Sequence, residues 1–417
     1  MPNFVCAQLD EFKFPARIGE CEFLWQKWEL KDGKKTENRV VFVSCHNDKF
    51  LLNIRAKNSG FVVKGDKITK PSNVSHLHSA LNAIKTAYAK GVITDTVSTK
   101  ETEKLQYVLE PHKLASVLNG DESEDAFLFP HIFGVWNLEF FDEIRLEIGF
   151  GGGKHLLYRA EHEPNVLFVG VEIYRPGIAR ASKISSELGL RNVLFTNADA
   201  RQLCELFKDD LFDMIYLHFP IPWNDSPTRR VINANFVLEL NRILKQNGKF
   251  QLRSDDFEFF NDSVKLFLKL PNTDIRIVKD RQLEIVSKYE SRWREQNKDI
   301  YDLIYTCDKK VDLLHQCDDC DFEFENIEEG TIENIKAKFS NQTKKYETFF
   351  IHYECLYENE EAQSLLLKVS FGDFFTPCSS YILITNSIVQ YLIKPPKTKA
   401  NAAAHGKLME YISCQIS

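Results

Sequence analysis

The stretch Leu146-Glu-Ile-Gly-Phe-Gly-Gly-Gly153 decides how this chain folds. An apolar strand is predicted over residues 144–148, it runs directly into the glycine-dense turn, and a helical pattern follows over residues 154–160. Glycines in such a turn let backbone N–H groups approach a ligand with no Cβ in the way. The order of strand, glycine-rich turn and helix therefore predicts a nucleotide-like binding site; a turn that merely joins a strand to a helix is the alternative.

The spacing of the glycines narrows the class of ligand. Gly149 and Gly151 satisfy the first half of the dinucleotide fingerprint, but its third glycine would fall on Lys154. No Gly-Lys-Ser/Thr ending of a phosphate-binding loop is present either. A nucleoside cofactor without phosphates fits better, and S-adenosyl-L-methionine is the common one.

Acidic residues stand at the ends of successive predicted strands. Glu147 ends the first strand, and Glu172 follows an apolar run over residues 166–171. An open α/β sheet places a carboxylate against ribose hydroxyls at about this distance from the glycines. Asp199 follows a third apolar run, over residues 193–196, and suits the adenine amino group. Ordinary solvated loop acids are the alternative interpretation.

The alternation of strands and helices continues beyond these acids. Helices are predicted over residues 175–188 and 201–207, and a fourth strand over residues 212–217. Strands and helices that alternate in this way favour a parallel sheet with ligands beyond its carboxyl ends. The predicted fold class is therefore α/β, a doubly wound Rossmann-like core.

A proline-rich segment, His218-Phe-Pro-Ile-Pro-Trp223, follows the fourth strand. Two prolines that flank one residue force an extended, rigid chain. Trp223 offers a flat face on which a base can stack, and Arg229 and Arg230 can reach phosphates. A stiffened loop with an aromatic packing anchor is the alternative.

With these motifs in order, residues 144–306 resemble the tRNA (guanine-N7-)-methyltransferase family, in a bacterial form with extra N- and C-terminal segments. Further landmarks are Val169-Gly-Val-Glu-Ile, Pro176-Gly, Ser254-Asp and Ser287-Lys-Tyr-Glu. The resemblance implies a class I methyltransferase core, S-adenosyl-L-methionine as the cofactor and tRNA as the partner. It implies transfer of a methyl group to N7 of a guanosine in the variable loop, as a step of tRNA processing.

The resemblance also implies roles for individual residues. The expected cofactor contacts are Glu147, Gly149, Gly151, Glu172 and Asp199. The expected catalytic residues are Asp255 and Glu290. The expected substrate contacts are Trp223, Arg229, Arg230, Asp255, Ser287, Lys288 and Glu290. No metal is expected.

Two features depart from the family pattern. The family has an acid between the two prolines, where this chain has Ile221. The family also has a basic run shortly after Trp223, where this chain has Asn224 and Asp225 before Arg229 and Arg230. Because guanine N7 carries a lone pair and no proton, its methylation needs no general base, and positioning can supply the catalysis. A catalytically silent tRNA-binding protein that retains the fold is the second hypothesis, and a methyltransferase for another RNA or a small molecule is the third.

Net charge locates the RNA surface only broadly. The chain has 417 residues, a formal charge of −7 and a pI near 5.9, so any phosphate-binding surface must be local. Its candidate cations are Arg229, Arg230, Arg242, Lys245, Lys249, Arg253 and the stretch 276–298.

Composition shifts divide the chain into segments. We predict a small α+β domain over 1–115, the methyltransferase core over 116–308, an acidic linker over 309–345 and a second small α+β domain over 346–417. The ten cysteines are scattered, which favours reduced thiols in the cytoplasm. No apolar run approaches the length that spans a membrane, so no membrane segment is expected. His315, Cys317 and Cys320 lack a second cysteine pair, which argues against zinc. A monomer and a homodimer both remain open.

Overall fold

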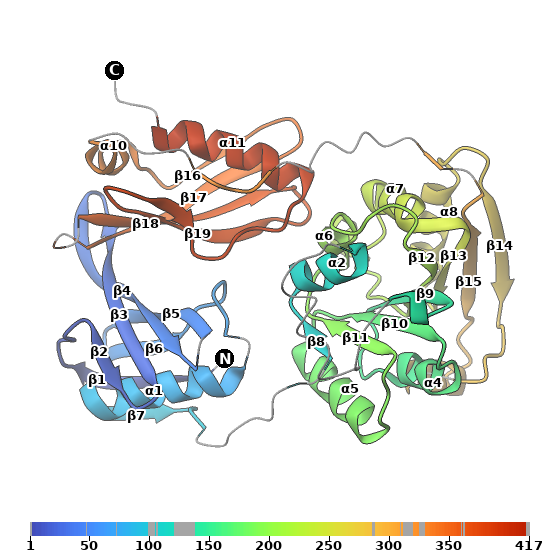
Figure 1. Cartoon of the computed structure of the whole chain (residues 1–417), viewed down its shortest axis with the longest axis horizontal. Coiled ribbons are helices and arrows are strands. Elements are labelled where there is room, and N and C mark those ends of the chain that lie inside the picture. The colour runs from blue at the N-terminus through green and yellow to red at the C-terminus, as the bar shows by residue number, and fades with distance from the viewer. Residues whose placement is uncertain are drawn as a thin grey trace. The chain divides into compact units, whose positions relative to one another are not determined.

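The computed structural model describes residues 2–46, 48–71, 73–98, 105, 107–120, 138–285, 288–308, 310–311, 320–324, 330–359, 361 and 363–413. The chain forms two compact units. One is Leu105–Gln316; the other combines Met1–Lys104 with Cys317–Ser417 (Figure 1). None of the described helices has both the length and the apolar character that a membrane-spanning segment requires.

The unit Leu105–Gln316 is built on one mostly parallel sheet. Its strand order is β14-β15-β13-β12-β9-β10-β11-β8. The strands are β8 (Val108–Leu109), β9 (Glu143–Ile148), β10 (Val166–Val171), β11 (Val193–Thr196), β12 (Phe212–His218), β13 (Leu244–Ser254), β14 (Asp274–Lys279) and β15 (Tyr301–Thr306). Only β15 runs antiparallel to its neighbours, β13 and β14. Strand order reverses at β9, between β10 and β12, and ligands of open α/β sheets bind at such a switch point.

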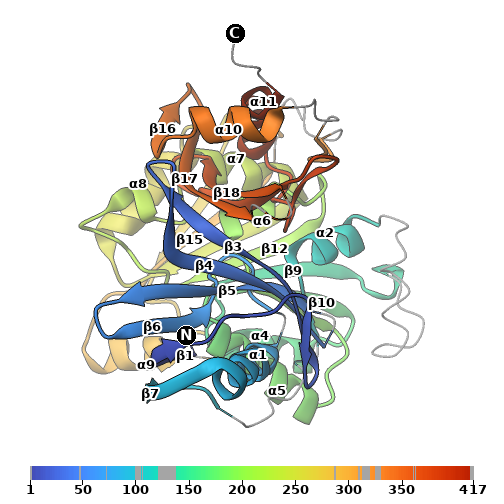
Figure 2. The same ribbon diagram turned by 90° about the vertical axis from the view of Figure 1, so that its left-hand side faces the viewer.

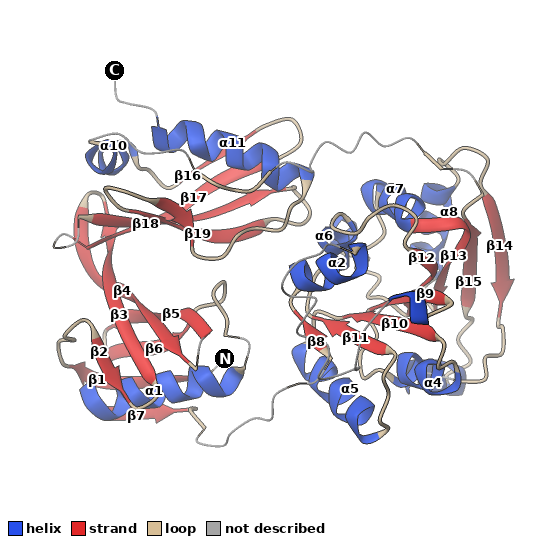
Figure 3. Cartoon of the chain, in the orientation of Figure 1, coloured by secondary structure: helices blue, strands red, loops and turns tan. Residues whose placement is uncertain are grey.

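Helices follow the strands in the order that the sequence predicts, as the alternating colours of Figure 3 show. They are α2 (Pro111–Asn119), α4 (Lys154–His162), α5 (Arg175–Glu187), α6 (Ala200–Cys204), α7 (Ala234–Ile243), α8 (Phe257–Phe267) and α9 (Lys288–Glu295). Alternate residues of β10 enter two different cores: Phe168 packs with α4 and α5, whereas Leu167 and Val169 enter the larger core that α7 and α8 cover. The doubly wound fold predicted from the sequence is confirmed.

The predicted strands agree closely with the observed ones because each is an apolar run ended by a turn. The runs 166–171 and 193–196 coincide with β10 and β11, and the run 144–148 lies within β9. Strand β12 extends the predicted 212–217 by one residue, His218. That residue proves important for the site.

The second unit joins the two ends of the chain in a single sheet. Its main order is β20-β19-β18-β17-β3-β4-β5-β6-β1-β7. The N-terminal elements are β1 (Asn3–Leu9), β2 (Ala16–Ile18), β3 (Cys21–Lys31), β4 (Lys34–Cys45), β5 (Asp48–Lys57), β6 (Gly60–Gly65), α1 (Val74–Tyr88) and β7 (Ala89–Asp95). The C-terminal elements are α10 (Thr331–Lys338), β16 (Gln342–Lys345), β17 (Phe350–Asn359), β18 (Ser364–Gly372), β19 (Cys378–Ile384), β20 (Val389–Tyr391) and α11 (Lys399–Ser413). Helices α10 and α11 lie together beside β17 and β18 (Figure 2).

This unit differs from the segments predicted from sequence. Strand β17 pairs with β3, with Leu356 opposite Leu30, so the two terminal segments share one sheet rather than forming separate domains. The predicted linker 309–345 contains α10 and β16. Cys21 and Cys45 are disulfide-bonded across β3 and β4, although reduced thiols were expected. Of the three residues considered for zinc and judged unsuited to it, His315 and Cys317 lie outside the described residues.

Candidate cofactor and RNA site

The glycine-rich loop lies at the switch point, between β9 and α4. Gly149 and Gly151 adopt φ values of 70° and 58°, in the left-handed region that side-chain-bearing residues rarely occupy. The Gly149 N–H donates to the carbonyl of Val171 at 2.8 Å, which ties the loop to the end of β10. Both glycines therefore lie where the sequence predicts a cofactor cradle, and their backbone conformation explains why glycine is needed.

Glu172 holds this loop in place. It is buried at the end of β10, and its Oε2 accepts a hydrogen bond from the Gly151 N–H at 2.8 Å. Its Oε1 accepts from the N–H groups of Ile173 and Tyr174 at 2.8 and 2.9 Å. An ionised carboxylate has about four acceptor positions, so one position remains for a ligand hydroxyl. Glu172 thus shapes the loop as well as facing the predicted ribose site.

Helix α5 approaches the loop closely at Gly177. A Cβ built on Gly177 would lie 2.4 Å from the carbonyl oxygen of Gly151. We therefore expect Gly177→Ala to displace the glycine loop, to destabilise the fold by roughly 1–3 kcal/mol, and to weaken binding of S-adenosylhomocysteine. Urea unfolding and calorimetric titration of the variant measure the two effects.

Gly152 offers a matched control in the same loop. A Cβ there would meet only Arg180 Cδ, at 3.8 Å, which is ordinary contact. Gly152→Ala should leave the unfolding free energy within about 0.5 kcal/mol of the parent. Equal losses in Gly152→Ala and Gly177→Ala would contradict the close approach of α5 as the cause.

Asp199 lies at the end of the neighbouring strand β11, as predicted. Its carboxylate caps α6 by accepting from the Arg201 N–H at 2.9 Å, and it forms an ion pair with the Arg201 guanidinium at 2.7 Å. Asn197 donates to the carbonyl of Glu172 at 2.8 Å, which links the two strand ends. Asp199 is therefore held at the sheet edge beside Glu172, although part of its acceptor capacity is used by Arg201.

Glu147 is buried and belongs to a cluster with two histidines. Its Oε2 accepts a hydrogen bond from His155 Nδ1 of α4 at 2.7 Å. The rings of His155 and His218 lie 4.7 Å apart, edge to face. Burial, and then the nearby charges of His155 and Arg253, lower the pKa of His218 well below its usual range. His218 is therefore neutral at physiological pH.

The three ligand-bearing groups of this cluster lie within 4.8 Å of one another and could hold a metal ion. The prediction that no metal is bound stays a prediction.

The segment after β12 forms a wall with an exposed tip. Phe219 and Trp223 adopt φ values of 51° and 46°, which turn the chain at each end of the proline-flanked segment. Ile221 between them is 61% exposed. The guanidinium of Arg229 stacks 3.8 Å from the centroid of the Trp223 ring. Trp223 and Arg229 therefore lie together on the loop, and their role in substrate contact stays a prediction.

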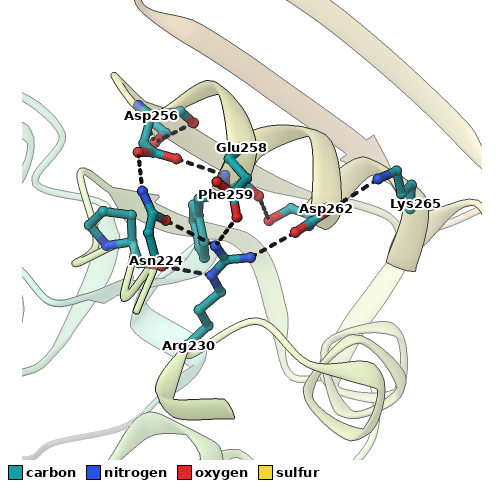
Figure 4. Close-up of polar contacts among 10 residues, drawn as sticks. Asn224, Arg230, Asp256, Glu258, Phe259, Asp262 and Lys265 are labelled. Atoms are coloured by element: carbon teal, nitrogen blue, oxygen red, sulfur yellow. Dashed lines mark hydrogen bonds and ion pairs between the residues drawn. The ribbon is translucent and has the colours of Figure 1, made fainter. Parts of the chain in front are cut away.

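Arg230 does not have the position predicted for it. It is 5% exposed, and its guanidinium donates to the Pro222 carbonyl at 2.6 Å and to Asp262 at 2.8 Å (Figure 4). It also donates to Asn224 Oδ1 at 3.0 Å. These contacts tie the proline-rich loop to α8, so Arg230 anchors the wall rather than reaching phosphates. Its sequence position beside Arg229 gave no sign of this difference.

Glu290 also differs from its predicted catalytic role. It is 1% exposed, and both of its carboxylate oxygens accept from the Arg253 guanidinium, the closer at 2.7 Å. The same guanidinium donates to both oxygens of Asp302, at 2.9 and 2.8 Å. Glu290 is thus part of a buried ion network that fastens α9 to β13 and β15. Because the Glu290 carboxylate is used in this way, it is not available to a nucleobase of the substrate.

Asp255 directly follows β13, at its carboxyl end, and its role on the substrate side stays a prediction. Its Oδ2 lies 2.9 Å from Lys298 Nζ, and the Lys298 ammonium lies 3.7 Å from the centroid of the Trp293 ring. Its side chain is 19% exposed, so unlike Glu290 it can be reached from outside. Ser287 lies outside the described residues, and for Lys288 only the backbone is described.

The structure adds two residues that pattern reasoning missed, His155 and His218, and gives Arg253 a structural role in place of the phosphate contact considered for it. His155 and His218 line a cavity of about 470 Å³ that opens along the face of β12, β13, β15 and β14. The alternation of polar and apolar residues along β12 and β13 was a signal that could have revealed this polar face.

The chain is similar to known methyltransferases. A family described as putative methyltransferase matches residues 142–303. A tRNA (guanine-N(7)-)-methyltransferase of Campylobacter fetus is 36% identical, over 100% of this chain and 100% of the relative. One of Helicobacter pylori is 32% identical, over 99% of this chain and 97% of its own. A solved antibiotic-related methyltransferase is 16% identical with a TM-score of 0.32, and covers 40% of this chain and 90% of its own.

Proposed function

The chain belongs to the tRNA (guanine-N(7)-)-methyltransferase family, and from this membership we propose that it transfers a methyl group from S-adenosylmethionine to N7 of a guanosine in tRNA. The observation that carries the proposal is identity of 36% along the whole of both chains, because it includes the terminal segments as well as the core. By the resemblance to the family, the target guanosine is in the variable loop.

The described residues fit the cofactor. The loop backbone at Gly149 and Gly151 lacks side chains, and Glu172 keeps an acceptor position for a ribose hydroxyl. Asp199 stands at the next strand end, where it would accept from the adenine amino group. Glu147 lies below the loop, where it positions α4 through His155. When bound, S-adenosylmethionine supplies an electrophilic methyl group on a sulfonium.

Methyl transfer to guanine N7 needs little help from the protein at the attacking atom. Guanine N7 is a neutral nucleophile, so a bond forms from N7 to the methyl carbon while the bond from that carbon to sulfur breaks. No proton moves, and the positive charge passes from the sulfonium to the purine. Catalysis can therefore come from alignment of the two reactants. This account explains how Ile221 can replace the acid of the family without loss of the reaction.

The target base must leave its stack to reach the site. N7 faces the deep, narrow groove of A-form RNA, which side chains read poorly. An unstacked guanine would lie against the wall formed by the proline-rich segment, with Trp223 and Arg229 at its rim. The exposed Ile221 supplies an apolar face for the purine.

The proposal is tested by incubating the protein with labelled S-adenosylmethionine and bulk tRNA, followed by borohydride and aniline treatment. We expect label in tRNA and chain scission, which this treatment produces at N7-methylguanosine. Label without scission would assign the protein to another RNA methylation. Cofactor binding without transfer of label would favour a silent tRNA-binding protein.

Asp255 is proposed to face the guanine, where its free acceptor position would bind N1–H and the 2-amino group. Asp255→Ala should leave binding of S-adenosylhomocysteine unchanged and reduce kcat/KM for tRNA by roughly 10- to 150-fold, since a hydrogen bond to a charged group contributes about 1.5–3 kcal/mol. Titration calorimetry and initial rates measure the two quantities.

Asp299→Ala is the matched control, because Asp299 forms a comparable exposed ion pair with Lys279 at 2.8 Å. It should leave both quantities unchanged. A parallel loss of cofactor binding in Asp255→Ala would mean that Asp255 acts on the fold through Lys298.

We also propose that the protein acts in the cytoplasm.

A further inference from the structure

The sheet of the methyltransferase unit has one face that is unusually polar. Parallel strands are ordinarily buried on both faces and are apolar throughout. In β12, β13 and β15, however, only alternate residues enter the hydrophobic core. These core residues are Ile215, Leu217, Phe250, Leu252, Leu303 and Tyr305. The residues between them face the other way, toward α4.

Strand register aligns these outward residues in two rows, because paired residues place their side chains on the same face. The first row is Arg145, Met214, Lys249, Thr306 and Asp274. The second row is Glu147, Tyr216, Gln251, Ile304 and Arg276. The cavity of about 470 Å³ runs over both rows. This polar groove, defined by the two rows, therefore has the sheet as its floor and α4 as one wall.

Cations dominate the lining of the groove. Arg159, Lys249, Arg276 and Arg281 line the cavity, against one lining carboxylate, Asp274. Arg159 is paired with Glu163 at 2.5 Å. Lys249 and Arg276 are exposed, and neither has an ion-pair partner among the described residues. The groove thus carries positive charge that the described part of the chain does not neutralise.

The structure separates these two cations from the other candidates for phosphate contact, apart from Arg229, which is exposed and stacks on Trp223. Arg230, Arg242 and Arg253 are buried in ion networks. Lys245 is paired with Asp213 at 2.8 Å. Only a cation that is both exposed and unneutralised can bind a phosphate without first breaking a protein contact. Lys249 and Arg276 meet both conditions.

We propose that the polar groove binds the tRNA backbone next to the target guanosine, with Lys249 and Arg276 each contacting a phosphate. This inference rests on tRNA being the substrate. The groove begins at His218, which directly precedes the proline-rich wall, and includes Arg281 and Leu283, which lead toward α9. An RNA strand that enters the groove is therefore continuous with the proposed base site.

Spacing supports two separate contacts. Lys249 and Arg276 are two strands apart and differ by one row, so their Cα atoms are roughly 12 Å apart by ordinary strand spacing. Long, flexible side chains at that separation can reach successive phosphates. A divalent cation or an apolar partner would not account for unneutralised positive charge at both positions.

Equilibrium binding of tRNA without cofactor tests the proposal. It is measured by fluorescence anisotropy from 50 to 300 mM salt, roughly the range over which such contacts weaken. The double variant that carries both Lys249→Gln and Arg276→Gln should bind about tenfold more weakly and lower the slope of log K against log salt by about 1.4–1.8. Lys249→Arg, which keeps the charge, should bind close to the parent. The affinity for S-adenosylhomocysteine should stay unchanged in both variants.

Lys269→Gln removes one exposed charge just after α8, on the opposite side of the sheet, and should leave both affinity and slope unchanged. An unchanged salt slope in the Lys249 and Arg276 double variant would overturn the proposal. A changed elution volume with unchanged tRNA affinity would overturn it too, by assigning the groove to a second copy of the chain. Because binding is measured without methyl transfer, absence of N7-methylguanosine would overturn the proposed function without changing the binding result.

Discussion

Glu172→Ala should weaken binding of S-adenosylhomocysteine by roughly 10- to 150-fold, because a charged hydrogen bond contributes about 1.5–3 kcal/mol. The carboxylate is 8% exposed and accepts from the N–H groups of Gly151, Ile173 and Tyr174. Its removal leaves these part-buried N–H donors without their acceptor and takes away the proposed ribose contact. Titration calorimetry of the purified full chain measures the change.

Two further variants separate the roles of Glu172. Glu172→Gln keeps the volume but turns an amide N–H toward either Gly151 or Ile173, so it should also lose affinity. Glu187→Ala on α5 removes an exposed carboxylate, whose weak ion pair with Lys183 spans 3.9 Å, and should have no effect. An unchanged dissociation constant for Glu172→Ala would reject both the loop role and the ribose role.

Arg253→Met should destabilise the methyltransferase unit by roughly 3–5 kcal/mol, which is typical when one partner of a buried ion pair is removed. Arg253 and Asp302 are both fully buried, and Glu290 is 1% exposed, so the variant would leave two buried carboxylates without a countercharge. Urea unfolding gives the free energy. Hydrogen exchange of peptides from β13 and β15 assigns the loss to this unit.

A cycle of variants tests whether the network is the cause. Adding Asp302→Leu and Glu290→Gln to Arg253→Met removes the stranded charges and should restore much of the lost stability. Arg191→Met, at an exposed position, should stay within about 0.5 kcal/mol of the parent. Failure of the added substitutions to restore any stability would point instead to lost packing around the Arg253 side chain.

The network also explains how the substrate side of the site is built. Helix α9 carries Glu290, and Arg253 on β13 holds it while also donating to the carbonyl of Arg281 at 2.7 Å. The chain between Arg281 and α9 is therefore fastened at both of its ends. Arg230 does the same for the proline-rich wall, by linking it to α8. Both sides of the proposed base site are thus held by buried arginines that do not themselves touch the substrate.

Local sequence predicted the strand ends and the glycine turn of the proposed cofactor side well. Glu172 and Asp199 lie at the ends of β10 and β11, and Gly149 and Gly151 have the positive φ angles that their turn requires. These features depend on neighbours in the chain: an apolar run predicts a strand, and a glycine-rich turn marks where it ends. The pattern of the residues was therefore sufficient to place them.

Local sequence predicted the substrate side less well. Arg229 and Arg230 are adjacent in the chain, yet one stacks on Trp223 at the surface and the other is buried against Asp262. The type of a charged residue does not reveal which residue it will pair with in the folded protein. Partners come from elements that meet only after folding, so exposure cannot be read from the residue type.

The amino-acid sequence by itself determined the doubly wound core and the glycine loop, because both follow from periodicity and turn chemistry over short stretches. Tertiary structure alone decided which charges face a ligand and which are used internally. Arg253 and Asp302, for example, are 49 residues apart and meet only through the pairing of β13 with β15. Tertiary structure alone also decided that β3 and β17 share a sheet, since backbone pairing between distant edges leaves no local pattern in either strand.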